Sequence, residues 1–86
     1  MGGKEYCKEI LNLLRQSGEV EWIKTFEYLI TIYSTDKQQF IRVIKVIYAG
    51  SNSFNDLVLY KNGVLCIEEN EKLADLRTKL FSRLFL

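Results

Sequence analysis

The chain has 86 residues, which is the length of a single small domain (1–86). Hydrophobic residues make up 48% of it and aromatic residues 13%, enough for an apolar core, which argues against intrinsic disorder. With 12 Lys and Arg against 11 Asp and Glu, the net charge of +1 argues against a partner bound by overall charge, such as nucleic acid.

The first predicted element is a helix over residues 4–16. Its apolar side chains recur at the three- and four-residue spacing of one helix face: Tyr6, Cys7, Ile10, Leu11, Leu13 and Leu14. Ser17 and Gly18 are expected to end the helix, because glycine readily adopts the left-handed conformation found at a helix C-terminus.

A second helix is predicted over residues 19–33. Its apolar stripe consists of Trp22, Ile23, Phe26, Leu29, Ile30 and Tyr33. Glu19 and Glu21 fall in its first turn, where negative charge suits the helix dipole. The segment 28–33 is rich in β-branched and aromatic residues, so a strand there is the competing interpretation.

The third predicted helix covers residues 36–48 and carries a broad apolar face. Thr35 and Gln38 match a capping box, in which each side chain binds the other residue's backbone N–H at the start of a helix. Ala49 and Gly50 should end this helix, and a loop of small polar residues over 50–53 follows.

A β-hairpin is predicted next, with strands over residues 57–61 and 64–67. The Asn62-Gly63 pair between them favours a type I′ turn, since both residues tolerate the positive φ that this turn requires. A lone hairpin is marginal in water, so one of its faces should pack on the helices.

The last predicted helix covers residues 70–85. Its apolar stripe consists of Leu73, Leu76, Leu80 and Leu84. Acidic residues lie toward its start and basic residues toward its end, the order that complements the helix dipole. The predicted fold class is therefore α+β, with three helices, a β-hairpin and a C-terminal helix packed as one small domain.

The residue inventory argues against an enzyme. The sequence has no histidine, which removes the commonest general base and the commonest metal ligand. Cys7 and Cys66 cannot form a zinc site by themselves. We expect both to be structural thiols, unless the fold brings them close enough for a disulfide. No glycine-rich phosphate loop is present, so no catalytic residue, metal or cofactor is expected.

Membrane and nucleic-acid partners are not expected either. No apolar run reaches the roughly 20 residues that span a membrane, and no secretion signal is visible, so we expect a cytoplasmic protein. The basic residues of the last two predicted helices are isolated, and aromatic residues do not alternate with them as they would in a nucleic-acid-binding surface. This pattern is typical of an ordinary solvated helix face. The basic residues are Lys37, Arg42, Lys45, Arg77, Lys79 and Arg83.

Binding another protein is the function class that remains. An acidic turn beside the hairpin could face a basic partner such as a nuclease domain, although a solvated helix start has the same composition. Its residues are Glu68, Glu69, Glu71 and Asp75. The chain is also rich in large aromatic residues, and any that are exposed would be candidate anchors. They are Trp22, Tyr28, Tyr33, Tyr48, Phe54, Tyr60, Phe81 and Phe85.

The C-terminal half carries a resemblance. Residues 49–60 read as a Gly/Ser loop and an Asn-Asp-Leu strand, and Asn62-Gly63, the acidic stretch 68–73 and a Leu/Arg helix follow. In this pattern the chain resembles a family of small, largely uncharacterised bacterial proteins, some of which are similar to toxin-immunity proteins. The resemblance implies a protein that stays in the producing cell and blocks a cognate secreted toxin.

Under this immunity or antitoxin hypothesis, the partner-binding residues are Glu68, Glu69, Glu71 and Asp75, followed by Asn55 and Asp56. Asn55 and Asp56 could equally cap and pin the hairpin. One alternative is a homo-oligomeric structural or adaptor domain, such as a homodimer, because a hairpin offers an edge strand to a second copy. A small enzyme or a nucleic-acid binder is the third hypothesis.

Overall fold

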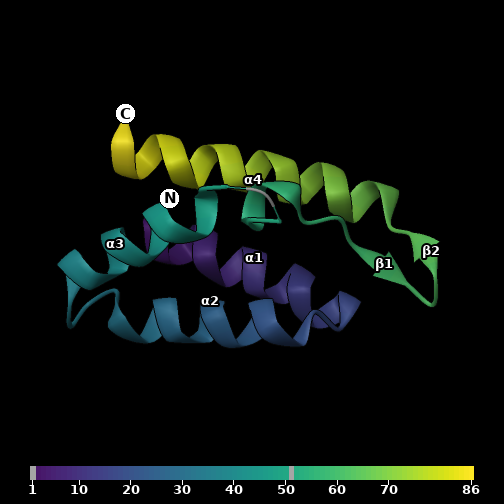
Figure 1. Cartoon of the computed structure of the whole chain (residues 1–86), viewed down its shortest axis with the longest axis horizontal. Coiled ribbons are helices and arrows are strands. Elements are labelled where there is room, and N and C mark those ends of the chain that lie inside the picture. Colours follow the sequence, from purple (N-terminus) through teal and green to yellow (C-terminus); the bar gives the residue numbers. More distant parts are fainter. Residues whose placement is uncertain (1, 51) are drawn as a thin grey trace.

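The computed structural model describes residues 2–50 and 52–86 (Figure 1). Met1 and Ser51 lie outside the described residues, so the predicted loop over 50–53 is described only in part. Within this part, helices and one hairpin follow in the predicted order, which confirms the α+β fold class. The elements are α1 (Gly3–Ser17), α2 (Val20–Ile32), α3 (Lys37–Tyr48), the 3-10 turn η1 (Phe54–Asp56), β1 (Tyr60–Lys61), β2 (Val64–Leu65) and α4 (Ile67–Phe85).

Helix α1 lies between α2 and α4 and contacts both of them (Figure 1). Cys7, Ile10 and Leu14 of α1 are fully buried, because a helix covered from two sides is apolar around much of its circumference. The remaining fully buried side chains come from every other helix and from the segment before the hairpin: Phe26, Leu29, Phe40, Ile44, Phe54, Leu59, Leu73 and Leu80. Burial of each large one contributes about 2 kcal/mol, so this cluster holds the helices together.

Helix α2 continues into the segment 28–33, so the competing interpretation of a strand there is wrong. The N–H of Tyr33 donates to the carbonyl oxygen of Leu29 at 3.0 Å, as in a helix. Leu29 and Ile32 are buried on the side of α2 that faces the core. Burial of this helical face outweighs the weak strand preference of the residues.

The predicted capping box at the start of α3 is also wrong. Asp36 is the N-cap, and its Oδ1 accepts a hydrogen bond from the N–H of Gln39 at 3.1 Å. Thr35 lies one residue too early, because the N–H groups of Thr35 and Asp36 still bind the carbonyl oxygen of Ile32. The hydroxyl of Thr35 donates to the carbonyl oxygen of Thr31 instead.

The hairpin has the predicted turn but shorter strands. Asn62 and Gly63 have φ values of 53° and 77°, which confirms the two positive values of a type I′ turn. Tyr60 pairs with Leu65 and Lys61 with Val64 in an antiparallel ladder. All four of these side chains are exposed, but Leu59 is buried and Leu57 and Cys66 pack against the core, so the base of the hairpin packs on the helices as expected.

Helix α4 begins three residues before the predicted start. The N–H of Asn70 donates to the carbonyl oxygen of Cys66 at 2.9 Å, which closes a helical turn around Glu68 and Glu69. Cys66 is half-buried and Cys7 fully buried, and both thiols are free, so they form no disulfide. In the part of the chain that the structure describes, no helix combines the length and the apolar character needed to cross a membrane.

Candidate functional site

The segment before the hairpin is bound to α4 by the side chain of Asn70. Its Oδ1 accepts a hydrogen bond from the N–H of Leu59 at 2.8 Å, and its Nδ2 donates to the carbonyl oxygen of Leu59 at 3.0 Å. Nδ2 also donates to the carbonyl oxygen of Cys66 at 2.8 Å. One amide therefore ties together the base of β1, the end of β2 and the first turns of α4.

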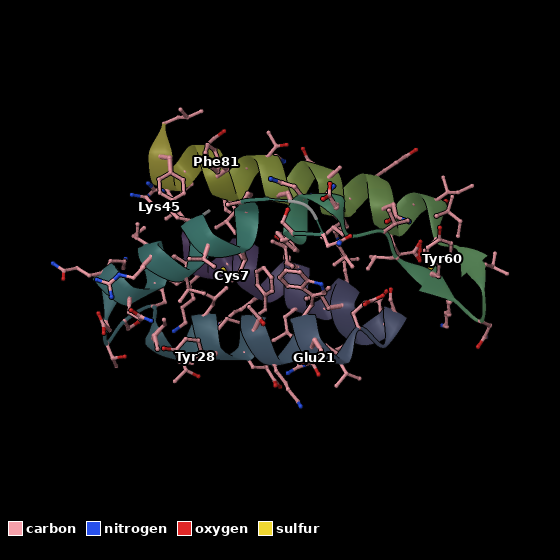
Figure 2. All side chains as sticks on the ribbon, viewed as in Figure 1. Cys7, Glu21, Tyr28, Lys45, Tyr60 and Phe81 are labelled. Atoms are coloured by element: carbon pink, nitrogen blue, oxygen red, sulfur yellow. The ribbon has the colours of Figure 1, made fainter. Side chains whose placement is uncertain are left out.

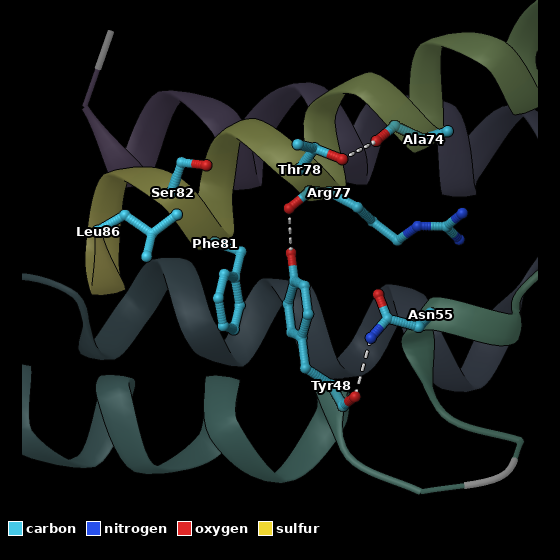
Figure 3. Close-up of a pocket in the computed structure, with 8 residues that line it drawn as sticks. All are labelled: Tyr48, Asn55, Ala74, Arg77, Thr78, Phe81, Ser82 and Leu86. Atoms are coloured by element: carbon cyan, nitrogen blue, oxygen red, sulfur yellow. Dashed lines mark hydrogen bonds between the residues drawn. The ribbon is translucent and has the colours of Figure 1, made fainter.

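Arg77 holds the preceding residues of the same segment. Its Nη1 donates to the carbonyl oxygens of Phe54 and Leu57 at 3.0 and 3.1 Å. The hydroxyl of Tyr48 donates to the carbonyl oxygen of Arg77 at 2.9 Å (Figure 3). Burial lowers the pKa of the Arg77 guanidinium, while the nearby Tyr48 and Asp56 oppose this effect. Arg77 is thus a structural cation rather than a surface one.

The four predicted acidic residues lie on two sides of α4. Glu68, Glu71 and Asp75 recur at spacings of three and four and are exposed, so they share the solvent face. Glu69 is half-buried because it stands four residues before the buried Leu73, at the head of the apolar stripe. We call the exposed surface of Glu68, Glu71 and Asp75 the acidic face. Asp75 also forms an ion pair of 2.9 Å with Lys79, which leaves Glu68 and Glu71 as its unpaired members among the described residues.

Asn55 and Asp56 lie apart from the acidic face. Asn55 donates from Nδ2 to the carbonyl oxygen of Tyr48 at 2.9 Å, and Asp56 accepts at Oδ2 from the N–H of Asn52 at 2.8 Å. Both residues therefore pin the loop. Both residues lie near Arg77. Asp75 precedes Arg77 by two residues, which correspond to a rotation of about 200° along a helix, so the two side chains project from nearly opposite sides of α4. Asn55 and Asp56 therefore lie on the side of α4 away from Asp75.

Exposed apolar side chains gather around the hairpin, at the same end of the molecule as the start of α4 (Figure 1). They belong to Val58, Tyr60, Val64, Leu65 and Ile67, and each exposes between 45% and 68% of its surface. Figure 2 shows Tyr60 on the projecting hairpin. We call this set of five residues the hairpin patch. Glu68 directly follows its last member in the sequence.

Basic residues also occur beside the other end of α4. Lys45 of α3 lies 5.7 Å from the ring centre of Phe85, which places α3 beside the last turns of α4. Glu68 and Glu71 belong to the first turns of α4, so they and Lys45 lie toward different ends of that helix.

Most of the eight aromatic residues belong to the core or its margin. Phe54 is fully buried and contacts the rings of Trp22, Phe26 and Tyr48. Among the eight, only Tyr28, Tyr60 and Phe81 are exposed. Tyr28 lies on the outer side of α2, away from the hairpin (Figure 2). Tyr60 is therefore the one exposed aromatic side chain in the hairpin patch.

A groove beside the end of α3 is lined by Tyr48, Asn55, Ala74, Arg77, Thr78, Phe81, Ser82 and Leu86 (Figure 3). Most of its polar groups already bind the protein itself: Asn55 binds Tyr48, Tyr48 binds Arg77, and Thr78 binds the carbonyl oxygen of Ala74. It offers few free polar groups to a ligand. No three His, Cys, Asp or Glu side chains of residues 2–50 and 52–86 are placed to hold a metal ion.

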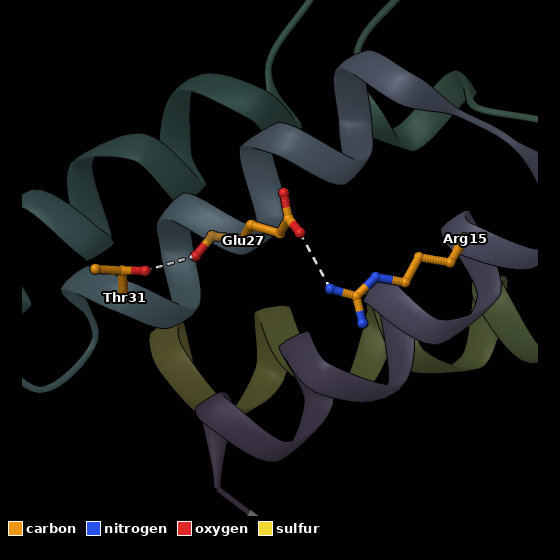
Figure 4. Close-up of polar contacts among 3 residues, drawn as sticks. All are labelled: Arg15, Glu27 and Thr31. Carbon is orange, nitrogen blue, oxygen red and sulfur yellow. Dashed lines mark hydrogen bonds and ion pairs between the residues drawn. The ribbon is translucent and has the colours of Figure 1, made fainter.

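One further polar contact joins α1 to α2 on the surface. The guanidinium of Arg15 lies 3.1 Å from the carboxylate of Glu27, and Thr31 donates to the carbonyl oxygen of Glu27 (Figure 4). Both charged side chains are more than half exposed, so water screens the pair and its contribution to stability is at most about 1 kcal/mol. It supports the packing of two helices and forms no site.

Sequence reasoning missed the two residues that organise this region, Asn70 and Arg77. Asn70 was expected only to open the last helix, and Arg77 only to complement its dipole. The predicted helix began at Asn70, where Asn is a favoured residue, so the sequence offered no signal of its contact with Leu59.

Comparison with known proteins gives one match. A family model described as a domain of unknown function, DUF6966, matches residues 15–67. No curated protein and no solved structure matches the chain significantly. The matched range contains Asn55, Asp56 and the whole hairpin patch, and it stops directly before Glu68.

Proposed function

The chain belongs to the DUF6966 family, and we propose that it is a non-enzymatic immunity or antitoxin-like protein that binds and neutralises a cognate bacterial toxin. Such a protein acts inside the cell that makes the toxin, so the cytoplasm is its proposed location. The proposed contact surface is the hairpin patch together with Glu68, Glu69, Glu71 and Asp75.

The hairpin patch is the observation that carries this proposal. Five large apolar side chains stay exposed within ten consecutive residues, on a hairpin that projects from the helices (Figure 1). Val58, Tyr60 and Leu65 share one face of this hairpin, and Val64 lies with Lys61 on the other. Water disfavours exposed apolar side chains, and patches of them mark binding sites in stable proteins. Tyr60 lies in the middle of the patch, and tyrosine is enriched among the side chains that dominate binding energy.

The acidic face supplies the chemistry of the partner. Glu68 and Glu71 are exposed and unpaired among the described residues, and they adjoin an apolar surface. A basic toxin domain, such as a nuclease, would be attracted to this end of the molecule and held by burial of the patch. An apolar centre with a charged rim is the usual anatomy of a protein interface.

The second candidate is a homo-oligomeric structural or adaptor domain. The outer edges of a two-stranded hairpin are open to further strands, and this observation favours self-association. Light scattering at high protein concentration separates the two candidates. A stable dimer in which the hairpin patch is buried would support the adaptor, and a monomer would exclude it.

Affinity capture from the native cell tests the first candidate. The wild-type protein is the bait, and mass spectrometry identifies what it retains. Recovery of the C-terminal domain of a large secreted protein is the expected result. The contact surface is tested in parallel with the variant Glu68→Gln, Glu69→Gln, Glu71→Gln and Asp75→Asn, which should retain much less of that domain.

A matched control removes as many negative charges elsewhere, at Glu5, Glu9, Glu21 and Glu27. This variant should capture the toxin domain as well as the wild type does. If both variants capture it equally well, the acidic residues are not the contact surface. If the wild type retains only further copies of itself, the immunity proposal is wrong.

A further inference from the structure

The backbone of residues 57–60 alternates between two sides. On one side, Arg77 binds the carbonyl oxygen of Leu57, and Asn70 binds both backbone groups of Leu59. The residues between them, Val58 and Tyr60, form no such contacts to α4. Because backbone groups of successive strand residues point to opposite edges, the N–H and C=O groups of Val58 and Tyr60 point to the other side.

The hairpin register supports this orientation for Tyr60. The N–H of Cys66 donates to the carbonyl oxygen of Leu59 at 3.1 Å, so Leu59 and Cys66 belong to a hydrogen-bonded pair. The neighbouring pair, Tyr60 and Leu65, is then a non-hydrogen-bonded pair whose backbone groups face outward. Among the described residues, no hydrogen bond satisfies the outward groups of Val58 or Tyr60.

A small groove adjoins Val58. It is lined by Trp22, Asn52, Ser53, Asp56, Leu57 and Val58. Its volume of about 190 Å³ is below the roughly 300 Å³ of small-molecule pockets and suits a single side chain. Asp56 is the only charged residue in the lining, and Trp22 offers an aromatic surface to a cation.

We infer that the open edge at Val58 and Tyr60 receives an extended, basic segment of the partner, which adds a strand there and places a Lys or Arg side chain in the groove beside Asp56. This inference rests on the proposed function and names how the partner docks. Val58 and Tyr60 present their outward backbone N–H and C=O groups to the added strand, and Asn70 and Arg77 hold the edge in place. A preformed edge of this kind lowers the ordering cost of binding.

Charge decides between the partner and a second copy of this chain. A second copy would bring another Asp56, and so a second negative charge, to the same edge. A basic segment supplies the missing positive charge. Two cations of this chain lie in the region, but neither supplies that charge. The Nη1 of Arg77, near Asp56, already donates to two carbonyl oxygens. Lys61 belongs to the opposite face of the hairpin from Tyr60.

The probe is a short synthetic peptide of alternating Lys and Val, added at up to millimolar concentration to the full ¹⁵N-labelled chain. In the free protein, the amide hydrogens of Val58 and Tyr60 should exchange quickly, whereas that of Leu59 is already protected by Asn70. With the peptide bound, we expect exchange at Val58 and Tyr60 to slow by about tenfold or more, with little change at Leu59.

Two controls separate strand addition from simple charge attraction. Only every second backbone N–H of an added strand faces Val58 and Tyr60. A peptide N-methylated at those residues should not bind, because the methyl groups remove the donors, and a peptide N-methylated at the other residues should bind almost as well as the unmodified one. Asp56→Asn should weaken binding about threefold, the effect of one exposed ion pair, and Glu5→Gln should not.

Three outcomes would overturn the inference. In the first, the peptide leaves the amide hydrogen exchange of Val58 and Tyr60 unchanged. In the second, a peptide of alternating Glu and Val binds equally well. In the third, exchange at the two amides slows in the free chain as its concentration rises, which would identify a second copy as the occupant. The proposed function fails separately. A captured toxin that leaves both amides unprotected refutes only the docking mode, and peptide binding without toxin capture refutes only the immunity role.

Discussion

The side-chain amide of Asn70 binds the backbone of Leu59 as a neighbouring strand would, through one accepted and one donated hydrogen bond of 2.8 and 3.0 Å. A residue of α4 thus takes the place of a strand partner for the segment before β1. The exposed hairpin keeps its position because this contact anchors its base. The orientation of the hairpin patch, and with it the proposed contact surface, therefore depends on Asn70.

Replacement of Asn70 by alanine should destabilise the fold by about 2–3 kcal/mol, since it leaves the N–H of the buried Leu59 without a partner and removes one of the two hydrogen bonds to its carbonyl oxygen. Urea unfolding measures the change. The matched control is Glu71→Ala, the exposed neighbour in the same helix, which should change stability by less than about 0.5 kcal/mol. Equal effects of the two substitutions would show that the amide does not anchor the hairpin.

Arg77→Lys should lower the free energy of unfolding by about 1–2 kcal/mol although it keeps the positive charge. Both hydrogen bonds, to the carbonyl oxygens of Phe54 and Leu57, come from a terminal guanidinium nitrogen, and the lysine side chain is one bond shorter, so its ammonium does not reach both oxygens. Lys79→Arg is the control, because Lys79 is exposed and pairs only with Asp75. A neutral Arg77→Lys result would contradict the structural role.

Alkaline pH should unfold the protein through Cys7 and Tyr48. Burial raises the pKa of the Cys7 thiol from 9.0 to about 12 and also raises the pKa of Tyr48. Both groups bind their protons more tightly when folded, so stability is complete below about pH 9 and falls as pH rises from there. Cys7 alone gives a slope of about 1.4 kcal/mol per pH unit.

Urea unfolding at a series of alkaline pH values measures that slope. Cys7→Ala should reduce it, whatever the cost of the substitution itself at neutral pH. A slope that Cys7→Ala leaves intact would mean that the Cys7 thiol does not control the transition.

The start of α3 allows a paired test of its cap. Asp36→Ala should cost about 1 kcal/mol, because Asp36 accepts the hydrogen bond from the N–H of Gln39. Thr35→Ala should cost less than about 0.5 kcal/mol, since the hydroxyl of Thr35 binds only a carbonyl oxygen of the preceding turn. The opposite order in thermal or urea unfolding would restore the predicted capping box.

The helices and the turn were predictable because their signals are local. The spacing of Ile10, Leu14 and similar residues places them on one face regardless of what covers that face, and Asn62-Gly63 determines its own turn. The extent of the strands was not predictable. Leu57 and Leu59 find backbone partners in Arg77 and Asn70, and contacts between residues so far apart in sequence depend on how α4 packs.

The candidate site was predictable only in part, for the same reason. The spacing of Glu68, Glu71 and Asp75 is enough to place them on one helix face. Their separation from Asn55 and Asp56 depends on the side of α4 to which η1 binds, and Arg77 determines that side. The exposure of the hairpin patch could not be inferred either, because an alternating apolar strand usually has a covered face.

Growth protection is the most direct measurement of the central claim, that this chain neutralises a toxin. The captured toxin domain is expressed in a sensitive bacterial strain together with the wild-type chain, with the variant that lacks the charges of Glu68, Glu69, Glu71 and Asp75, or with the charge-matched control. We predict growth with the wild type and the control, and growth arrest with the variant. Growth arrest with the wild-type chain, at expression levels that saturate the toxin, would contradict the account.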